Sequence, residues 1–410
     1  MNPNRIRIID RWIGQPVCLF LSLLRRLGLL FVPPGAPQGP PEKIVFIKLV
    51  EQGSTVLAYH ALSRAVQLVG RQNVYFWVFQ ENRFILDAMK IIPQENVFAI
   101  RTSSIPRAVF DMLRTARQIR RAGIDATVDM EFFSRASAIL AFLTRARRRV
   151  GLHRFGGDGP YRGNLLTHRL NYNPYLHTSQ TFLCMVEALL VPPDQTPMLK
   201  TVPPRTDSEL PRFEPTDEQL EKVRATLTDQ FGGSIPAPLI LINPNASDML
   251  PLRRWAPERM IELGRRILDQ HPHAGLAVTG APNEAAPAAE IARAIGTERV
   301  ACMAGRTTLD ELIVLYTLAD VLVTNDSGPA HFAALTDIEV VALFGPETPE
   351  LYSPLSPRSH PIWAGLACSP CVNVFNHRFS PCNDNVCMRE IEVDQVYETV
   401  NKILAAKSTA

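Results

Sequence analysis

The stretch "IVFIKLVEQGSTVLAYHAL", residues 44–62, decides the fold class because it joins a strand pattern to a helix pattern. Its mostly apolar start, 44–49, predicts a buried strand, the glycine at position 53 predicts a tight turn, and the sequence after it predicts a helix over 55–69. α/β proteins often place their chemistry at such strand-to-helix turns. This turn holds a single carboxylate, Glu51, which is therefore the first candidate for a functional residue.

The same alternation of strand and helix patterns continues along the chain. Further strands are predicted at 74–79, 97–100, 125–130, 148–152, 239–243, 275–280, 299–305, 320–326 and 339–345. Further helices are predicted at 106–121, 133–145, 177–190, 257–270, 284–296, 308–318, 328–335 and 391–405. This order indicates βαβ units with mostly parallel sheets, so we expect an α/β fold with two doubly wound domains that face a cleft.

A proline-rich sequence without periodicity, 191–215, marks the boundary between the two domains. Thr216 and Gln219 follow it with the spacing of a helix capping box. The length of 410 residues also favours two domains over one. We divide the chain into an N-terminal segment with its linker (1–42), a first Rossmann-like domain (43–195), a linker (196–216), a second Rossmann-like domain (217–390) and a C-terminal helix (391–410).

The composition is that of an ordinary globular protein, with 46% hydrophobic and 20% charged residues. The net charge of +3 gives no reason to expect a nucleic-acid partner. The N-terminus lacks a secretory signal with a small-residue cleavage site, so we expect a cytoplasmic protein with reduced thiols.

The N-terminal sequence "RIRIIDRWIGQPVCLFLSLLRRLGLLFVPP", residues 5–34, is both apolar and basic. Its apolar run from Val17 to Leu24 is too short to span a bilayer. A basic helix with Trp12 and Phe20 suits a membrane interface, and a helix docked on the body of the protein is the alternative. We favour the cytoplasmic membrane surface as a partner, which would place the protein peripherally on the inner membrane.

The stretch "VLVTNDSGPAHFAAL", residues 321–335, predicts a strand that runs directly into a helix. Backbone N–H groups at a helix start carry the positive end of the dipole and suit a phosphate. We therefore predict a phosphate site at Asp326, Ser327 and Gly328, with His331 one helical turn further on. Simple N-capping by Asp326 or Ser327 is the alternative, and a histidine such as His331 is by itself more often structural than catalytic.

Two arginines, Arg253 and Arg254, follow the strand predicted at 239–243. Two guanidinium groups could clamp a diphosphate and neutralise a leaving group without a metal, although one of the two fits a solvated basic surface equally well. Glu284 stands at the start of the helix predicted at 284–296. It could accept hydrogen bonds from ribose hydroxyls or interact with the helix dipole.

Four cysteines near the C-terminus have the spacing C-x2-C-x10-C-x4-C. They are Cys368, Cys371, Cys382 and Cys387. Four thiolates can form a closed structural zinc site, with reduced packing thiols or a redox-labile pair as the alternatives. The sequence has no GxGxxG after its first strand, no GxxxxGK[ST] and no HExxH, which argues against a Rossmann dehydrogenase, a P-loop enzyme and a zincin.

Taken in order, these features resemble glycosyltransferase family 9, the lipopolysaccharide heptosyltransferase family, over roughly residues 43–405. The resemblance rests on "IKLVEQGSTVLAYHAL", "NPNASDMLPLRRW", "TGAPNE", "AGRTTLDELIVLYTLADVLVTNDSGPAH" and "LFGPETPELYSP". It implies a GT-B fold whose N-terminal domain binds a lipopolysaccharide-core or other lipid-linked acceptor. It further implies that the C-terminal domain binds a nucleotide sugar, usually ADP-heptose, and that transfer inverts the anomeric centre in one displacement without a required cofactor or metal.

The resemblance also assigns roles to the candidate residues. Arg253 matches a position, usually Lys, that contacts the donor phosphates, and Glu284 matches a carboxylate near the donor nucleoside. The diphosphate-binding turn is matched by Asp326, Ser327, Gly328 and His331. The first turn of the family usually reads "LGDV", with the aspartate as general base, and the aligned residue here is Ser54. A serine hydroxyl is too weakly basic for this role without an activator, so Glu51 in the same turn is the nearest substitute.

The sequence therefore predicts an inverting glycosyltransferase with Glu51 and Ser54 in its catalytic turn. Glu51 could instead be a solvated loop carboxylate, and Ser54 the N-cap of the helix at 55–69. Because the family aspartate is missing, a non-catalytic relative that binds a nucleotide sugar or a glycolipid is the alternative function. A GT-B epimerase that acts on the donor sugar alone is a third.

Overall fold

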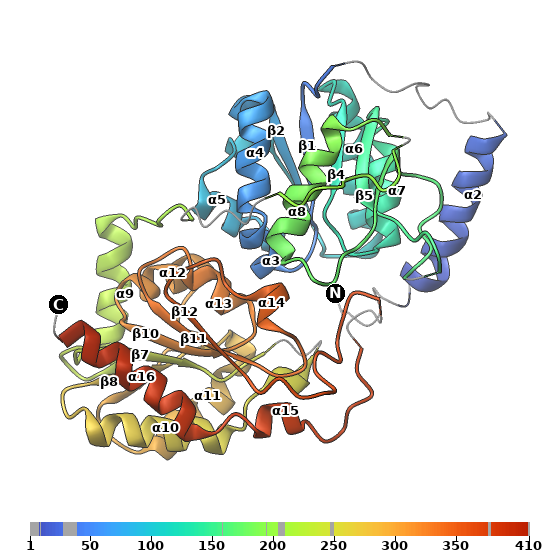
Figure 1. Ribbon diagram of the computed structural model, residues 1–410. Helices are drawn as coiled ribbons and strands as arrows, with labels where there is room; N and C mark the ends of the chain where they lie inside the picture. Colours follow the sequence, from blue (N-terminus) through green and yellow to red (C-terminus); the bar gives the residue numbers. More distant parts are fainter. Residues whose placement is uncertain are drawn as a thin grey trace. The chain divides into compact units, whose positions relative to one another are not determined.

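The computed structural model describes residues 8, 10–27, 39–157, 159–193, 195–203, 210–246, 250–375 and 379–408 (Figure 1). The chain divides into two compact units. One is Met1–Thr206 with Val374–His377, and the other is Asp207–Asn373 with Arg378–Ala410. Among the residues that the structure describes, no helix has both the length and the apolar character needed to cross a membrane.

The first unit is built on a six-stranded parallel sheet with the order β3-β2-β1-β4-β5-β6. Its strands are β1 (Ile44–Ile47), β2 (Val74–Phe79), β3 (Val97–Ile100), β4 (Ala126–Asp129), β5 (Arg148–Leu152) and β6 (His168–Leu170). Strand β1 pairs with β2 on one side and with β4 on the other, so the order of the chain reverses between β1 and β4. Open α/β sheets bind their ligands at such a switch point, beside the carboxyl ends of the strands.

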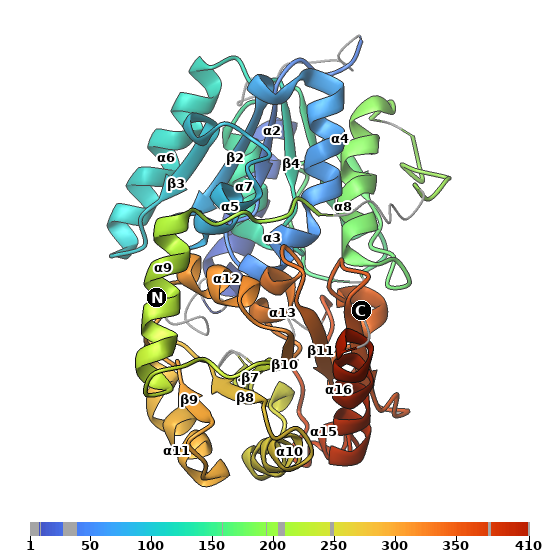
Figure 2. The same ribbon diagram turned by 90° about the vertical axis from the view of Figure 1, so that its left-hand side faces the viewer.

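Helices cover both faces of this sheet (Figures 1 and 2). Helices α4 (Tyr59–Val69) and α8 (Thr178–Glu187) lie together on one face, and α6 (Ile105–Arg121) and α7 (Arg135–Leu143) lie on the other. The other helical elements are η1 (Asp10–Gly14), α2 (Gln15–Arg26), α3 (Gln52–Leu57), η2 (Arg71–Asn73), η3 (Gln80–Asn82), α5 (Phe84–Met89), η4 (Gln94–Asn96) and η5 (Ala188–Leu190). The alternating residues of β1 explain this arrangement, since Val45 and Ile47 pack against the α6 and α7 side.

The second unit repeats the design with a parallel sheet of order β12-β11-β10-β7-β8-β9. Its strands are β7 (Leu239–Asn243), β8 (Gly275–Val278), β9 (Val300–Cys302), β10 (Val321–Asn325), β11 (Glu339–Phe344) and β12 (Ser359–Trp363). Its helical elements are α9 (Asp217–Gln230), η6 (Pro251–Arg253), α10 (Pro257–Gln270), η7 (Pro282–Glu284), α11 (Ala285–Ile295), α12 (Leu309–Thr317), α13 (Gly328–Ala333), α14 (Pro349–Tyr352), α15 (Val386–Arg389) and α16 (Val393–Ser408). Here the order of the chain reverses between β7 and β10.

All predicted strands are present, and the structure adds two that the sequence did not predict, β6 and β12. Both lie at an edge of their sheet. Strand β12 contains Pro361, which has no backbone N–H to donate and is tolerated in a strand only where one side needs no ladder partner. The capping box of Thr216 and Gln219 is confirmed by both of its hydrogen bonds.

The predicted turn and helix after β1 need a correction. The expected single helix over 55–69 is two helices, α3 and α4, separated at Ala58. Gly53 does not form the turn, because α3 already begins at Gln52. The residue with the left-handed backbone is Glu51, with a φ of 67°, which sequence reasoning had no signal to assign to a glutamate.

The N-terminal helix α2 is docked on the first unit. Cys18 is fully buried against Ala138, Phe142 and Leu165. Asp10, just before α2, accepts hydrogen bonds from the first backbone N–H groups of α7 and so caps that helix. The docked alternative therefore describes one face of α2, while the rest of the N-terminal segment, residues 1–7, 9 and 28–38, lies outside the described residues.

The buried histidine of β6 predicts a pH dependence for the first unit. Burial lowers the pKa of His168 to about 4, although its ring contacts the Val191 carbonyl oxygen at 3.1 Å. The pKa of His168 is lower in the folded than in the unfolded protein, so the free energy of unfolding is highest above about pH 6.5, where the ring is neutral in both states. It decreases as the pH falls toward 4, because the unfolded protein takes up the proton first. Chemical denaturation should show that the free energy of unfolding falls by roughly 3 kcal/mol over this pH interval. In His168→Gln this decrease should be absent. An equally steep loss in that variant would contradict the assignment.

Candidate active site

The turn after β1 holds Glu51 in a strained and partly buried position. Its φ of 67° and ψ of 77° lie in the left-handed region, which costs a residue other than glycine roughly 1 kcal/mol. The side chain is 21% exposed, and its Oε2 lies 3.4 Å from the Nζ of Lys48. Such backbone strain persists only where surrounding contacts enforce it, and it concentrates at functional sites.

Two neighbours supply those contacts, and sequence reasoning named neither. Lys48 is fully buried, and its Nζ also reaches the Val50 carbonyl oxygen at 2.7 Å and the Glu131 Oε2 at 3.3 Å. Glu131, just beyond the end of β4, accepts the backbone N–H of Leu49 at 2.6 Å and of Val50 at 3.0 Å through its Oε1. Glu131 therefore fixes the path of the turn, and Lys48 links the two glutamates at the switch point between β1 and β4.

A second buried ion pair lies next to this turn, at the end of β4. Asp129, the last residue of β4, is fully buried and pairs with Arg162. Its carboxylate also accepts the Ser137 hydroxyl at 3.0 Å and the Glu131 backbone N–H at 3.1 Å. Burial raises the pKa of Asp129, and the nearby positive charge of Arg162 opposes that rise.

Ser54 has a different role from the one expected of it as an N-cap. The N-cap of α3 is Glu51, and Ser54 lies inside the helix. The Ser54 hydroxyl donates to the Glu51 carbonyl oxygen at 2.8 Å and lies 3.4 Å from the Glu51 Oε2. Ser54 therefore helps hold the left-handed turn through its contacts with Glu51. The prediction of Glu51 as a purely solvated loop carboxylate is wrong, because Lys48 contacts it.

The second unit places the predicted phosphate turn at the carboxyl end of β10. Ser327 is the N-cap of α13, and no hydrogen bond from a helix N–H reaches its side chain, so simple side-chain capping does not explain it. Its hydroxyl lies 3.4 Å from that of Thr324. Asp326 and His331 are both buried. A Cβ at Gly328 would lie 3.1 Å from the ring of Phe332, one turn further along α13, so glycine leaves room for that ring.

Arg253 joins this turn, as the predicted donor site requires. Its Nη1 donates to the Asp326 carbonyl oxygen at 3.2 Å, and its Nε lies 3.4 Å from the Asp326 Oδ2. Its Nη2 donates to the Oε1 of Glu347 at 3.3 Å, and Glu347 is almost fully buried. Glu347 belongs to the "LFGPETPELYSP" stretch, but no local pattern indicates that its carboxylate meets Arg253.

Arg254 and Glu284 are tied to backbone groups nearby. Arg254 donates through Nε and Nη2 to the Ala246 carbonyl oxygen, at 3.2 Å and 2.8 Å. Residues 247–249 of the same loop lie outside the described residues. Glu284 accepts the Ala281 backbone N–H at 2.8 Å and so supports the helix start. This contact fits the expected alternative to a role in binding ribose hydroxyls. The structure thus joins Arg253 to the β10 turn and uses Arg254 to shape the loop before it.

The four C-terminal cysteines are not arranged as a metal site. Cys368 and Cys382 are exposed, whereas Cys387 is buried and its pKa is raised to about 11 by that burial. The Sγ of Cys387 contacts the Asn385 Oδ1 at 3.6 Å. Within the part of the chain that the structure describes, no three His, Cys, Asp or Glu side chains are placed to hold a metal ion. The side chains as placed do not fit zinc, and the zinc site stays a prediction.

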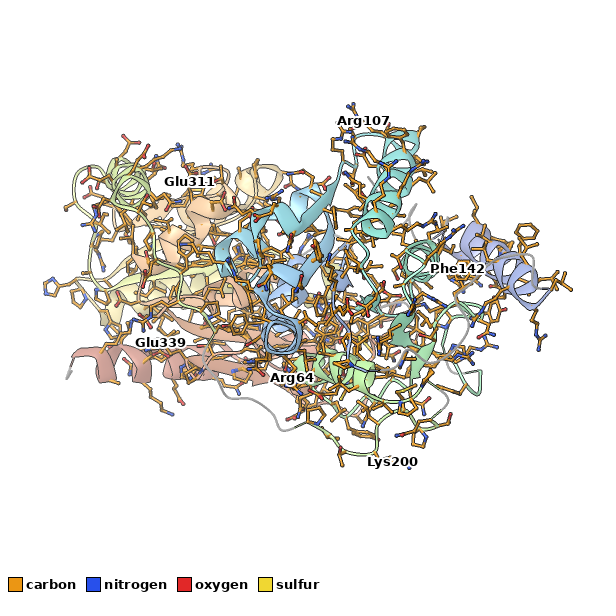
Figure 3. All side chains as sticks on the ribbon, turned by 90° about the horizontal axis from the view of Figure 1, so that it is seen from above. Arg64, Arg107, Phe142, Lys200, Glu311 and Glu339 are labelled. Carbon is orange, nitrogen blue, oxygen red and sulfur yellow. The ribbon has the colours of Figure 1, made fainter. Side chains whose placement is uncertain are left out.

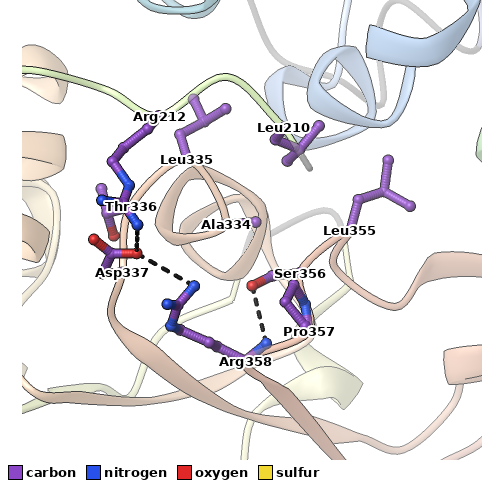
Figure 4. A pocket seen from close by; sticks show the side chains of 10 residues that line it. All are labelled: Leu210, Arg212, Ala334, Leu335, Thr336, Asp337, Leu355, Ser356, Pro357 and Arg358. Carbon is purple, nitrogen blue, oxygen red and sulfur yellow. Dashed lines mark hydrogen bonds and ion pairs between the residues drawn. The ribbon is translucent and has the colours of Figure 1, made fainter. Parts of the chain in front are cut away.

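A small pocket of the second unit lies away from these residues (Figure 4). Asp337 forms ion pairs with Arg212 and Arg358 in its wall. Asp337 precedes β11 and Arg358 precedes β12, so the pocket lies at the amino edge of the sheet. The predicted phosphate turn lies at the opposite, carboxyl edge, so this pocket is not the candidate donor site.

Comparisons with known proteins identify relatives of this chain. A family model described as glycosyltransferase family 9 (heptosyltransferase) matches residues 112–378. Lipopolysaccharide heptosyltransferase 2 of Escherichia coli is 33% identical over 163 residues, 38% of this chain and 46% of that protein. Lipooligosaccharide heptosyltransferase 2 of Haemophilus influenzae is 30% identical over 217 residues, 51% of this chain and 58% of that protein. The chain thus spans about half the length of the curated relatives it matches.

Solved structures confirm the GT-B fold. The structure of E. coli ADP-heptose lps heptosyltransferase II matches 89% of this chain and 99% of its own, with a TM-score of 0.65 and 20% sequence identity. A family 9 glycosyltransferase from Veillonella parvula matches 89% of this chain and 97% of its own, with a TM-score of 0.67 and 18% identity. At these identities the likeness concerns the fold alone.

Proposed function

The chain belongs to glycosyltransferase family 9, and from this premise we propose that it is an inverting glycosyltransferase. It moves a heptose- or hexose-type sugar from a nucleotide-diphosphate donor, with ADP-heptose as the first candidate, to a lipopolysaccharide-core or other lipid-linked acceptor. The observation that carries the proposal is the buried Lys48 beside Glu51 at the switch point of the first sheet. Backbone strain at a carboxylate paired with a buried cation is concentrated at functional sites, which favours a working role for this turn.

On the acceptor side, Glu51 acts as general base. It takes the proton of an acceptor hydroxyl while the hydroxyl oxygen forms a bond to the anomeric carbon of the donor sugar. The bond from that carbon to the diphosphate breaks in the same displacement, and the nucleoside diphosphate leaves with the electron pair. The Nζ of Lys48 lies 3.4 Å from the Glu51 Oε2 and fixes the position of the carboxylate.

On the donor side, the residues around the β10 turn bind the diphosphate. The backbone at Ser327 and Gly328 presents N–H groups at the start of α13, and Arg253 supplies a fixed positive charge beside them. Because Arg253 also contacts Asp326 and Glu347, its guanidinium is held in place before the donor arrives. This charge could stabilise the leaving diphosphate without a metal.

Replacing Arg253 by methionine should weaken binding of the nucleotide donor by about 10- to 100-fold, because hydrogen bonds to charged groups contribute roughly 1.5–3 kcal/mol each. Arg254→Met should weaken it less, since Arg254 holds the loop backbone. Arg265→Met, on an exposed face of α10, serves as the matched control. Titration of ADP and ADP-sugars followed by thermal shift reports these affinities. Equal losses in the Arg253 and Arg254 variants would contradict the assignment.

The alternative function, a non-catalytic relative that binds a nucleotide sugar or glycolipid, is favoured by one observation, the serine at the position of the family aspartate. A thermal-shift screen of nucleotide sugars identifies the donor first. Turnover of that donor with an acceptor extract supports the transferase, and binding without turnover on any acceptor supports the alternative. Interconversion of the donor sugar without an acceptor would instead identify an epimerase.

The lipid-linked nature of the proposed acceptor places the protein at the cytoplasmic face of the inner membrane. The basic and apolar N-terminal helix supports this location, because one face of α2 is buried on the first unit while apolar side chains of its other face are exposed.

A further inference from the structure

Two helices of the first unit, α2 and α6, expose large apolar side chains. Those of η1 and α2 are Trp12, Ile13, Leu19, Phe20 and Leu23. Those of α6 are Ile105, Val109, Phe110 and Leu113. Single exposed apolar residues are normal on a protein surface, but a group of them on one side of a domain marks an interaction site.

The two helices lie on the same side of the sheet, with α7 between them. Helix α7 contacts both α6 and α2. Figure 3 shows Arg107 of α6 and Phe142 of α7 on one side of the sheet and Arg64 of α4 on the other. Cys18 of α2 packs against Phe142, which places α2 beside α7. The exposed side chains of α2 and α6 therefore border one surface of the unit.

This surface includes the edge of the sheet that carries the candidate base. Helix α6 begins at Ile105, shortly after the carboxyl end of β3. The turn η1 lies where α7 begins, just beyond the carboxyl end of β4, because Asp10 caps α7 there. Trp12 in η1 and Phe110 near the start of α6 thus lie toward the carboxyl edge, where Glu51 follows β1.

The charges on η1, α2 and α6 are mostly positive. The basic residues are Arg11, Arg25, Arg26, Arg107, Arg114, Arg117, Arg120 and Arg121. The acidic residues of these elements are Asp10 and Asp111. Asp10 pairs with Arg135, and Asp111 forms two hydrogen bonds of 2.9 Å with the guanidinium of Arg101. Hydrogen bonding to Arg101 lowers the pKa of Asp111 to about 2. Both carboxylates are thus paired with arginines from outside these three elements, and the helices keep an excess of positive charge.

We propose that α2 and α6 together bind the anionic surface of a lipid bilayer. The apolar side chains enter the boundary between headgroups and acyl chains, and the arginines contact lipid phosphates. Trp12, 70% exposed, has the amphipathic ring that is enriched at this depth. The purpose of this membrane binding rests on the proposed function. It is to present the carboxyl edge of the first sheet to a lipid-linked acceptor.

Vesicle cosedimentation of the full-length chain tests the proposal. Vesicles of phosphatidylethanolamine and phosphatidylglycerol at three to one should bind the protein, and phosphatidylcholine vesicles should bind it much less. Phe110→Ser with Leu113→Ser in α6, and separately Phe20→Ser in α2, should each weaken binding by about tenfold or more, since an apolar side chain of this size contributes at least a factor of ten when buried. Leu190→Ser, exposed in η5 after α8, is the matched control.

Several outcomes would overturn the proposal. These are absence of vesicle binding, equal binding to both kinds of vesicle, and full binding by the α6 variant. Loss of a self-associated state in either variant, seen by light scattering, would identify the surface as an interface between copies of the chain. Donor binding and transfer to a soluble acceptor fragment involve none of the substituted residues. Failure of vesicle binding therefore does not contradict the proposed function, and failure of transfer does not contradict the lipid-binding surface of α2 and α6.

Discussion

Replacing Glu51 by glutamine should lower the turnover number for sugar transfer by about 10²- to 10⁴-fold, the usual contribution of a general base. Glutamine keeps the size of the side chain and can present its amide oxygen to Lys48, 3.4 Å away. It cannot accept a proton at neutral pH. The donor contacts lie on β10 and η6 of the second unit, so the affinity for ADP should stay within twofold of wild type.

Two further variants make the Glu51 result specific. Glu131→Gln keeps the hydrogen bonds from the Leu49 and Val50 backbones, and Ser54→Ala removes only the hydroxyl that holds the turn. Both should lower transfer far less than Glu51→Gln. Full turnover by Glu51→Gln would show that Glu51 is not the base. A greater loss in Glu131→Gln would move the role of base to Glu131.

The order of strands and helices was predictable from sequence because it depends on local patterns. Buried parallel strands such as β7, "LILIN", are short apolar runs, and helices such as α10 begin at a proline and repeat apolar residues at helical spacing. The two strands that the patterns did not predict, β6 and β12, owe their stability to their position at the edge of a sheet. Strand β6 has only three residues, strand β12 contains polar residues and a proline, and both exist because a sheet edge is available for them.

The candidate site was predictable only in part, for the same reason. Glu51 and the turn at Asp326 follow strands that the pattern located, and Arg253 lies in η6, in the loop after β7. Their partners are distant in sequence: Glu131 lies 83 residues from Lys48, and Glu347 lies 94 residues from Arg253. No local pattern connects such pairs.

The left-handed backbone of Glu51 was also beyond sequence reasoning. The glycine at position 53 was the natural choice for that conformation, since glycine adopts it without steric penalty. The structure instead places Gly53 in α3, and the hydrogen bonds from Leu49 and Val50 to Glu131, with that from Ser54 to Glu51, hold the turn. Tertiary contacts thus decided which residue takes the strained conformation.

Lys48→Met should have the largest effect on stability of any single change at this turn. Methionine fills nearly the same volume, so the main loss is a positive charge that is fully buried between two carboxylates. Removing one partner of a buried ion pair lowers the free energy of unfolding by roughly 3–5 kcal/mol. For a unit of this size, the thermal midpoint should fall by about 2–4 °C for each kcal/mol. Differential scanning calorimetry measures both quantities.

A double variant shows whether that loss arises from the charge on Glu131. Lys48→Met with Glu131→Gln has neither the cation nor its more deeply buried anion, so it should recover at least 1 kcal/mol relative to Lys48→Met alone, as coupled neighbours usually do. Turnover in sugar transfer should also fall in Lys48→Met, because the cation that contacts the Glu51 carboxylate is lost. A merely structural lysine would change the thermal midpoint and leave the turnover number of the folded enzyme in place. An unchanged midpoint together with an unchanged turnover number would show that Lys48 neither supports the turn nor positions the base.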